Sequence, residues 1–261
     1  MGPITLITDF GDADHYVACM KGVILQRVPD ARVIDVTHRI QHQDILAAAF
    51  VLRHVMPSFP SGTIHVAVVD PGVGSRRRIL AGRYAGQTIL APDNGLVSLV
   101  HRDFKLEMLR SVENATLIAR TSSATFQGRD IFAPVAGALL AGLEIDEVGP
   151  AVEEPVLLDI ECPVPLESGG LRGRVLHVDH FGNLISNIRV EDLDALGVPA
   201  GQLNVVIGST QVGPLRFTYS DVAVGEVLAL IGSTGMVEVA IHRGHAASRL
   251  SVGVGTSLTV R

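Results

Sequence analysis

Carboxylate and guanidinium groups that could act on a substrate are concentrated in residues 64–78, which read I-H-V-A-V-V-D-P-G-V-G-S-R-R-R. The apolar, valine-rich residues 64–69 predict a buried strand that ends at Asp70. The glycines that follow allow a tight turn and close approach of the backbone to a ligand. Because open α/β sheets bind ligands beyond the carboxyl ends of their strands, Asp70 and the arginines at 76–78 form a candidate site. From this segment alone, an Asp that caps a turn and pairs with a surface arginine is an equally good interpretation.

A second carboxylate, Asp9, follows a short apolar segment, residues 3–8, that also predicts a strand. At a strand end an acidic side chain can accept hydrogen bonds from both hydroxyls of a ribose, as in nucleotide-binding α/β folds. We therefore interpret Asp9 as a binding residue. Asp12 and Asp14 precede a helix expected over residues 16–28, and capping of that helix accounts for them.

For several other polar residues a structural role is the better interpretation. His38 and His42 are four positions apart, but they lie outside an H-E-x-x-H pattern and in an expected loop, which argues against a zinc site. Asn94 lies at the start of an expected helix, and capping is the better interpretation. The polar loop 121–130 precedes an alanine-rich helix expected over 131–143, and loops in such positions often carry function.

The pattern of predicted secondary structure changes along the chain. Apolar strands and amphipathic helices alternate at first, which predicts an α/β N-terminal domain, residues 1–165, with a central, mostly parallel sheet flanked by helices. The segment 151–170 is rich in Pro, Glu and Gly and predicts the domain boundary. Short β-rich runs with regular turns then predict a smaller all-β domain, residues 170–261, with an antiparallel, barrel-like architecture. A short helix near 191–196 is expected to interrupt it.

Composition narrows the class of protein. The chain of 261 residues is 47% apolar and can bury a sizeable core, while its net charge of −6 offers no basic footprint for nucleic acid. Cys19 and Cys162 give neither a disulfide framework nor a metal-ligand spacing. Neither a signal-like start nor a membrane-spanning apolar stretch is visible. We therefore expect a soluble, cytoplasmic protein without metal, nucleic-acid or membrane partners.

Ordered motifs span nearly the whole chain. They are T-D-F-G at 8–11, I-D-V-T-H at 34–38, V-D-P-G-V-G-S-R-R at 69–77, A-P-D-N-G-L at 91–96, T-F-Q-G-R-D-I-F at 125–132 and D-H-F-G-N at 179–183. In these motifs the chain resembles the S-adenosyl-L-methionine (SAM) hydroxide adenosyltransferases, the adenosine-forming SAM hydrolases. That family is similar to the fluorinases and chlorinases, which use halide instead of hydroxide.

The resemblance implies a reaction and an assembly. Water or hydroxide attacks the ribose C5′ of SAM in line, and adenosine and L-methionine leave. SAM is the substrate, and the resemblance implies no cofactor. It also implies an α/β N-terminal domain, a β-rich C-terminal domain and a homotrimer with active sites at the subunit interfaces.

The resemblance also assigns roles to residues. Asp70 and Arg77 match the family's catalytic Asp and Arg, whereas Gln127 stands where the family pattern has a catalytic His. Asp9 matches the carboxylate that binds the ribose diol. The remaining matches concern substrate binding: Asp179, Phe181, Asn183, Ser233 and Ala246.

Two alternatives stay open. A halide-dependent adenosyltransferase is disfavoured because the Asp70 carboxylate would repel the anion. A low-activity SAM- or adenosine-binding protein stays open because Gln127, unlike His, does not titrate and can only position water.

Overall fold

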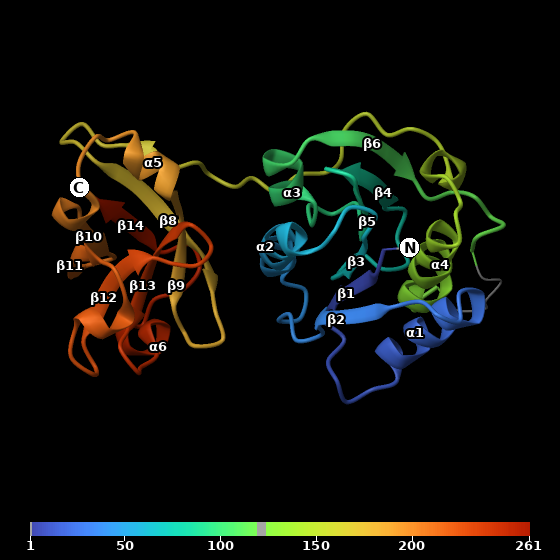
Figure 1. Ribbon diagram of the computed structural model, residues 1–261, viewed down its shortest axis with the longest axis horizontal. Helices are drawn as coiled ribbons and strands as arrows, with labels where there is room; N and C mark the ends of the chain where they lie inside the picture. The colour runs from blue at the N-terminus through green and yellow to red at the C-terminus, as the bar shows by residue number, and fades with distance from the viewer. Residues whose placement is uncertain (1, 119–123) are drawn as a thin grey trace. The chain divides into compact units, whose positions relative to one another are not determined.

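The chain folds as two compact units, residues 1–158 and 159–261 (Figure 1). The structure is a computed structural model, and it describes residues 2–118 and 124–261. The start of the polar loop, residues 121–123, therefore lies outside the described residues. Within the described part of the chain, no helix is both long and apolar enough to cross a membrane. The predicted domains 1–165 and 170–261 stay a prediction.

Unit 1 is built on a six-stranded sheet in the order β2-β1-β3-β5-β4-β6. Its strands are β1 (Ile4–Thr8), β2 (Val33–Thr37), β3 (Ile64–Val68), β4 (Ile79–Tyr84), β5 (Gln87–Pro92) and β6 (Leu106–Ser111). The pairings among β2, β1, β3 and β5 are parallel, whereas β4 pairs antiparallel with β5 and with β6.

The sheet is therefore mixed, where the sequence predicted a mostly parallel one. Only Ala85 and Gly86 separate β4 from β5, and both have positive φ, 48° and 73°. A two-residue turn of this kind makes a tight antiparallel hairpin, whereas a parallel connection needs a crossover of a dozen or more residues. The short turn after Tyr84 thus imposes the antiparallel edge.

Alternating side chains of β3 enter two different cores. Val66 and Val68 pack with helices α1 (Tyr16–Arg27) and α4 (Ala133–Leu140), while Ala67 packs with α2 (Ile45–Val55). The short helix α3 (Ser98–Asp103) also contributes to the second core. The sheet is thereby packed on both faces.

Two helix starts in unit 1 show how local residues set them. Asp44 caps α2, since its carboxylate accepts a hydrogen bond of 2.9 Å from the backbone N–H of Ala47. The helix predicted from residue 131 begins earlier, as a turn of π-helix over Gly128–Phe132 that continues directly into α4. Pro134 lies just after the junction of the two helical segments and, because it has no N–H, cannot donate a helical hydrogen bond there.

Unit 2 is a closed β-barrel. Its strands are β7 (Val164–Pro165), β8 (Leu171–Val178), β9 (Leu184–Arg189), β10 (Asn204–Ile207), β11 (Thr210–Arg216), β12 (Val227–Ile231), β13 (Met236–Ile241) and β14 (Ser257–Val260). They follow the order β14-β10-β11-β12-β13-β9-β8-β7, and β14 also pairs with β8, which closes the barrel. The barrel encloses an apolar core.

Helix α5 (Val190–Asp194) lies where a short helix was expected, and a second helix, α6 (Ala246–Leu250), was not expected. The barrel is also not wholly antiparallel, because β11 and β12 pair in parallel. The sequence reading also missed β9, because Ser186 and Asn187 break its apolar run. Both side chains are buried. The Asn187 amide is satisfied, since it accepts from the N–H of Arg174 at 2.8 Å and donates to the carbonyl of Glu161 at 2.8 Å.

Candidate functional site

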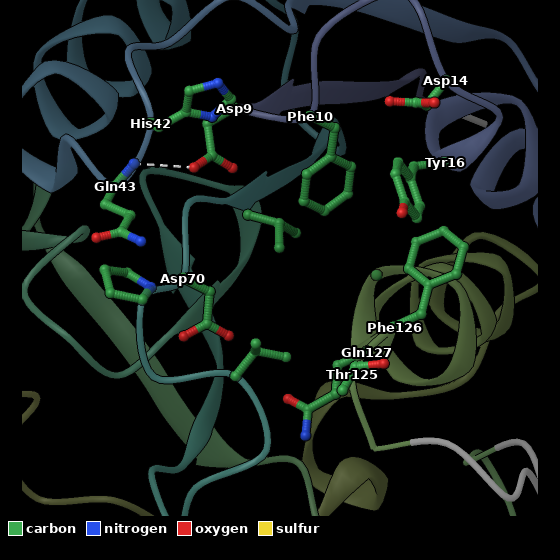
Figure 2. Close-up of a pocket in the computed structure, with 14 residues that line it drawn as sticks. Asp9, Phe10, Asp14, Tyr16, His42, Gln43, Asp70, Thr125, Phe126 and Gln127 are labelled. Carbon is green, nitrogen blue, oxygen red and sulfur yellow. Dashed lines mark hydrogen bonds between the residues drawn. The ribbon is translucent and has the colours of Figure 1, made fainter.

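A pocket of about 570 Å³ opens at the carboxyl ends of β1 and β3 in unit 1 (Figure 2). Its walls come from the loops after these two strands, from the segment before α2 and from the turn that precedes the π-helix. Asp9, Asp70 and Gln127 line it. The volume is typical of pockets for small molecules, which span roughly 300–1,000 Å³.

Arg77 links two of the predicted catalytic residues. Its Nε donates to Asp70 Oδ1 at 2.7 Å, and its Nη2 donates both to Asp70 Oδ2 and to the amide oxygen of Gln127. The side chains of Asp70 and Arg77 are only 5% and 10% exposed. The Asp70 carboxylate thus sits in a two-point, fork-like ion pair, the strongest and most directional kind.

The three neighbouring arginines have different places. Arg77 alone among them binds Asp70, whereas Arg78 binds Asp93 with its Nε at 2.6 Å from Oδ2. Arg76 is exposed. Arg77 lies seven residues after Asp70, and the turn between them is closed by a hydrogen bond from Ser75 N–H to Gly72 O (3.0 Å). The chain folds back across this turn, so that Arg77 reaches Asp70.

Asp9 stands across the pocket from Gln127 (Figure 2). Its Oδ2 accepts a hydrogen bond of 3.0 Å from the backbone N–H of Gln43. Gln43 has φ of 65°, a left-handed conformation that is uncommon for a residue with a side chain. One carboxylate oxygen therefore binds the neighbouring loop, while the side chain as a whole lines the pocket.

Three aromatic rings form another part of the wall (Figure 2). The ring centroids of Phe10 and Tyr16 are 5.9 Å apart, those of Tyr16 and Phe126 are 5.0 Å apart, and those of Phe10 and Phe126 are 6.3 Å apart. The tilted and edge-on geometries are favourable for aromatic pairs. Together the rings offer an apolar, π-rich surface beside the two carboxylates, which suits a nucleobase or a soft cation.

His38 and His42 do not form a metal site with other side chains. His42 lines the pocket, but His38 is buried, with Nδ1 2.9 Å from Thr8 Oγ1 and Nε2 3.0 Å from Asp35 Oδ1. In residues 2–118 and 124–261 no group of three His, Cys, Asp or Glu side chains is arranged to hold a metal ion.

In unit 2, three predicted binding residues share one turn between β8 and β9. Asp179 Oδ1 accepts from the N–H of Phe181 at 2.9 Å and of Asn183 at 2.8 Å, and its Oδ2 accepts from the Asn183 side chain at 3.0 Å. Phe181 is 71% exposed and Asn183 is buried. An exposed aromatic ring is thus held on a rigid polar turn.

Of the other two predicted residues of unit 2, Ala246 lies in helix α6 and Ser233 lies in a turn. The Asp179 turn reaches α6, because the N–H of Ala247 donates to the carbonyl of Gly182 at 3.0 Å, and the buried Ala246 is the first residue of α6. Ser233 is exposed in the turn between β12 and β13.

Two family patterns match the chain and together cover most of it. The pattern of the SAM hydroxide adenosyltransferase N-terminal domain matches residues 4–149, and that of the C-terminal domain matches residues 173–259. The chain belongs to the SAM hydroxide adenosyltransferase family. The resemblance expected from the motifs is confirmed.

Relatives of this adenosyltransferase family member carry consistent names. A protein of Salinispora tropica named (R)-S-adenosyl-L-methionine hydrolase is 40% identical over 98% of this chain and 97% of its own. One of Thermus thermophilus with the same name is 39% identical over 100% of this chain and 99% of its own. A fluorinase of Actinoplanes sp. is more distant, at 27% identity over 98% and 96%.

A solved structure also matches. The crystal structure of an uncharacterized conserved protein from Thermotoga maritima superposes with a TM-score of 0.92 at 34% identity, covering 98% of this chain and 99% of that chain.

Several pocket residues of this adenosyltransferase family member escaped the sequence reading. Tyr16 was expected only as the start of a helix, and Phe10 and Phe126 were seen inside motifs without a role. Their positions in the sequence could have indicated a place in the pocket, because Phe10 directly follows Asp9 and Phe126 directly precedes Gln127.

A buried carboxyl in unit 2 was missed as well. The Tyr219 hydroxyl donates to Glu238 Oε1 at 2.7 Å. Burial raises the pKa of Glu238, the Tyr219 hydrogen bond opposes this, and the negative charge of Asp179 adds to the rise. A glutamate inside the otherwise apolar strand β13 was the available signal.

Proposed function

We propose that this protein hydrolyses SAM to adenosine and L-methionine by in-line attack of water or hydroxide on the ribose C5′. The observation that carries the proposal is the Asp70–Arg77–Gln127 cluster on the wall of a nucleoside-sized pocket. The full-length relatives named as hydrolases of the (R) sulfonium epimer support it, and we extend the proposal to that epimer.

The chemistry makes modest demands on the protein. The oxygen of water forms a bond to C5′ while the C5′–S bond breaks, and the electron pair leaves with methionine as a neutral thioether. Such a leaving group needs no general acid. The protein must hold water in line with the C–S bond and take up its proton, and holding reactants in attack geometry is worth several orders of magnitude in rate.

Each residue of the cluster has a part in this proposal. Asp70 orients the water and accepts its proton, and Arg77 stabilises the negative charge that develops on the attacking oxygen. Arg77 holds Gln127 through the amide oxygen of Gln127. The NH₂ group of Gln127 can then donate a hydrogen bond to the oxygen of the attacking water. In place of a titrating His, this chain thus offers a neutral donor.

Binding is assigned to the remaining residues. Asp9 accepts hydrogen bonds from the ribose diol, and the aromatic wall receives the apolar faces of the nucleoside. Asp179, Phe181, Asn183, Ser233 and Ala246 are proposed to contact the methionine moiety and the nucleoside from the C-terminal domain.

An isotope experiment tests the reaction. Each sulfonium epimer is incubated with the protein in H₂¹⁸O, and adenosine is analysed by mass spectrometry, with Asp70→Asn as control. We expect adenosine that carries one ¹⁸O at its 5′ position, from the (R) epimer, and strongly reduced product in the control. Adenosine without the label, or no release of adenosine from either epimer, would contradict hydrolysis at C5′.

Two further arms separate the alternatives. A halide enzyme would form 5′-halo-5′-deoxyadenosine when chloride or fluoride is added, which Asp70 disfavours because a carboxylate repels an anion. A binding protein would retain SAM or adenosine without turnover, as calorimetry would show.

We also propose the homotrimer with shared sites. Mixing Asp70→Ala with Asn183→Ala subunits should restore activity, because some hybrid sites would carry neither substitution. No recovery after confirmed subunit exchange would place the whole site in one chain.

A further inference from the structure

The loop that carries Asp70 and Arg77, residues 70–78, has little support of its own. Its middle residues are mostly exposed, and the hydrogen bonds within it close local turns, such as Val73 N–H to Asp70 O at 3.2 Å. These bonds do not fix the distance between the two ends of the loop. The ion pair of Asp70 and Arg77 spans the loop, so its geometry depends on where those ends are held.

Asp93 holds the end of the loop at Arg78. Its Oδ2 accepts from Arg78 Nε at 2.6 Å, and its own N–H donates to the Arg78 carbonyl at 3.0 Å. Its Oδ1 accepts from the N–H of Val156 at 2.7 Å, and its side chain is only 3% exposed. Arg78 also donates to the carbonyl of Glu154 at 3.1 Å, so the contacts of Asp93 and Arg78 extend to the last segment of unit 1.

Asn94, the next residue, holds the other end. Its side-chain Nδ2 donates to the carbonyl of Val69 at 2.9 Å, directly before Asp70. Its Oδ1 accepts from the N–H of Leu96 at 3.2 Å, which orients the amide. One turn after β5 therefore grips both ends of the loop.

We propose that Asp93 and Asn94 are positioning residues, which hold the loop ends so that Arg77 stays in its two-point pair with Asp70. The inference rests on the proposed function. Neither residue is among the described residues that line the pocket, so both act through the loop. A misplacement of catalytic groups by about 1 Å can cost about 10²-fold in rate, which sets the scale of the effect.

Asp93→Asn is the informative change because it keeps the shape of the side chain. The groups bound by Asp93 are all donors, the Arg78 guanidinium and the Val156 N–H. An asparagine amide would turn a donor toward one of them and leave that contact unmade. Asp103→Asn is the matched control, since Asp103 is 7% exposed and binds Arg53 and Arg102 at 2.8 and 3.0 Å.

The kinetic test is a double-mutant cycle with Arg77→Ala, measured as single-turnover rates together with the dissociation constant of adenosine. We expect Asp93→Asn to lower the rate about 10²-fold with adenosine binding almost unchanged, and Asp103→Asn to leave the rate near the parent's. In the Arg77→Ala background, Asp93→Asn should cause no further loss. Independent losses that multiply, or an equal loss in the control, would overturn the inference.

A second readout does not depend on turnover, so it separates this inference from the proposed function. In the parent, the Arg77 Nε–H is hydrogen-bonded to Asp70, and its exchange with solvent can be followed by ¹⁵N NMR. Exchange should be faster in Asp93→Asn but not in Asp103→Asn, and unchanged exchange would overturn the positioning role even in an inactive parent. If Asp93→Asn does not fold, Asn94→Ala carries both tests.

Discussion

Gln127 accepts a hydrogen bond from the guanidinium of Arg77 through its side-chain oxygen. Because Arg can only donate, this contact fixes which way the amide points. The same guanidinium pairs with Asp70, so the proposed catalytic centre is one cluster in which a cation separates a carboxylate from a neutral amide.

We expect Gln127→His to raise the single-turnover rate, because an imidazole can take up the proton of the attacking water, whereas an amide cannot. General acid–base groups contribute about 10²–10⁴-fold, which bounds the gain. The dissociation constant of adenosine should hardly change. Gln127→Asn, whose amide is too short to reach Arg77, is the control and should be slower than the parent. An unchanged rate with altered affinity in Gln127→His would show that this position binds substrate.

Arg77→Ala should lower the rate by about 10²–10³-fold, as expected when a donor that stabilises developing negative charge is removed. Arg76→Ala, which removes an exposed cation one position away, is the matched control and should be close to the parent. Thermal unfolding of both variants should be recorded, since Asp70 loses its partner only in the first. Equal losses in the two variants would point to a general electrostatic effect of the loop.

Asp9→Asn should weaken adenosine binding more than 2′-deoxyadenosine binding, because the deoxy compound lacks one of the two hydroxyls that the carboxylate is proposed to bind. The loss of one charge-assisted hydrogen bond corresponds to about 1.5–3 kcal/mol, or roughly 10–150-fold in affinity. Calorimetry on the parent and the variant with both ligands gives the comparison. Equal weakening for the two ligands would mean that Asp9 acts only by holding the Gln43 loop.

The stability of unit 2 should depend on Glu238 in a defined direction. Burial raises the pKa of Glu238 above its ordinary value of 4.5, so the folded state holds the proton more tightly than the unfolded chain. This contribution is fully present below about pH 4.5 and is lost as pH rises through the folded-state value.

Glu238→Gln keeps an oxygen acceptor for Tyr219 and removes the titration. We therefore expect the difference in the free energy of unfolding, variant minus parent, to increase between pH 4.5 and pH 7. Urea unfolding of both proteins at several pH values measures it. Glu161→Gln, at an exposed carboxyl of the same unit, is the control. A difference between parent and variant that does not change with pH would contradict the expectation.

Activity should survive dialysis against EDTA, because the proposed reaction expels a neutral thioether and needs no Lewis acid. The rate of adenosine release is measured before and after chelation, and again after zinc or magnesium is added back. Loss of activity that either metal restores would require a metal site built differently from the proposed cluster.

The sequence patterns alone predicted the buried strands β1 and β3 and the polar residues that follow them. Asp9 and Asp70 could be placed at strand ends because an apolar, β-branched run has a readable start and end. The ordered motifs identified the family, because several short patterns in one order are very specific. They also located Gln127 as the departure from the family pattern.

Tertiary structure decided everything that depends on contacts between distant segments. Asn187, inside the buried strand β9, is satisfied by the backbone of Arg174 and Glu161, which are distant in the sequence. Three adjacent arginines have the same chemistry, and only the motif resemblance singled out Arg77; the structure shows that Arg77 pairs with Asp70 while Arg78 pairs with Asp93. Local sequence encodes propensity, but which donor meets which acceptor follows from the path of the backbone in three dimensions.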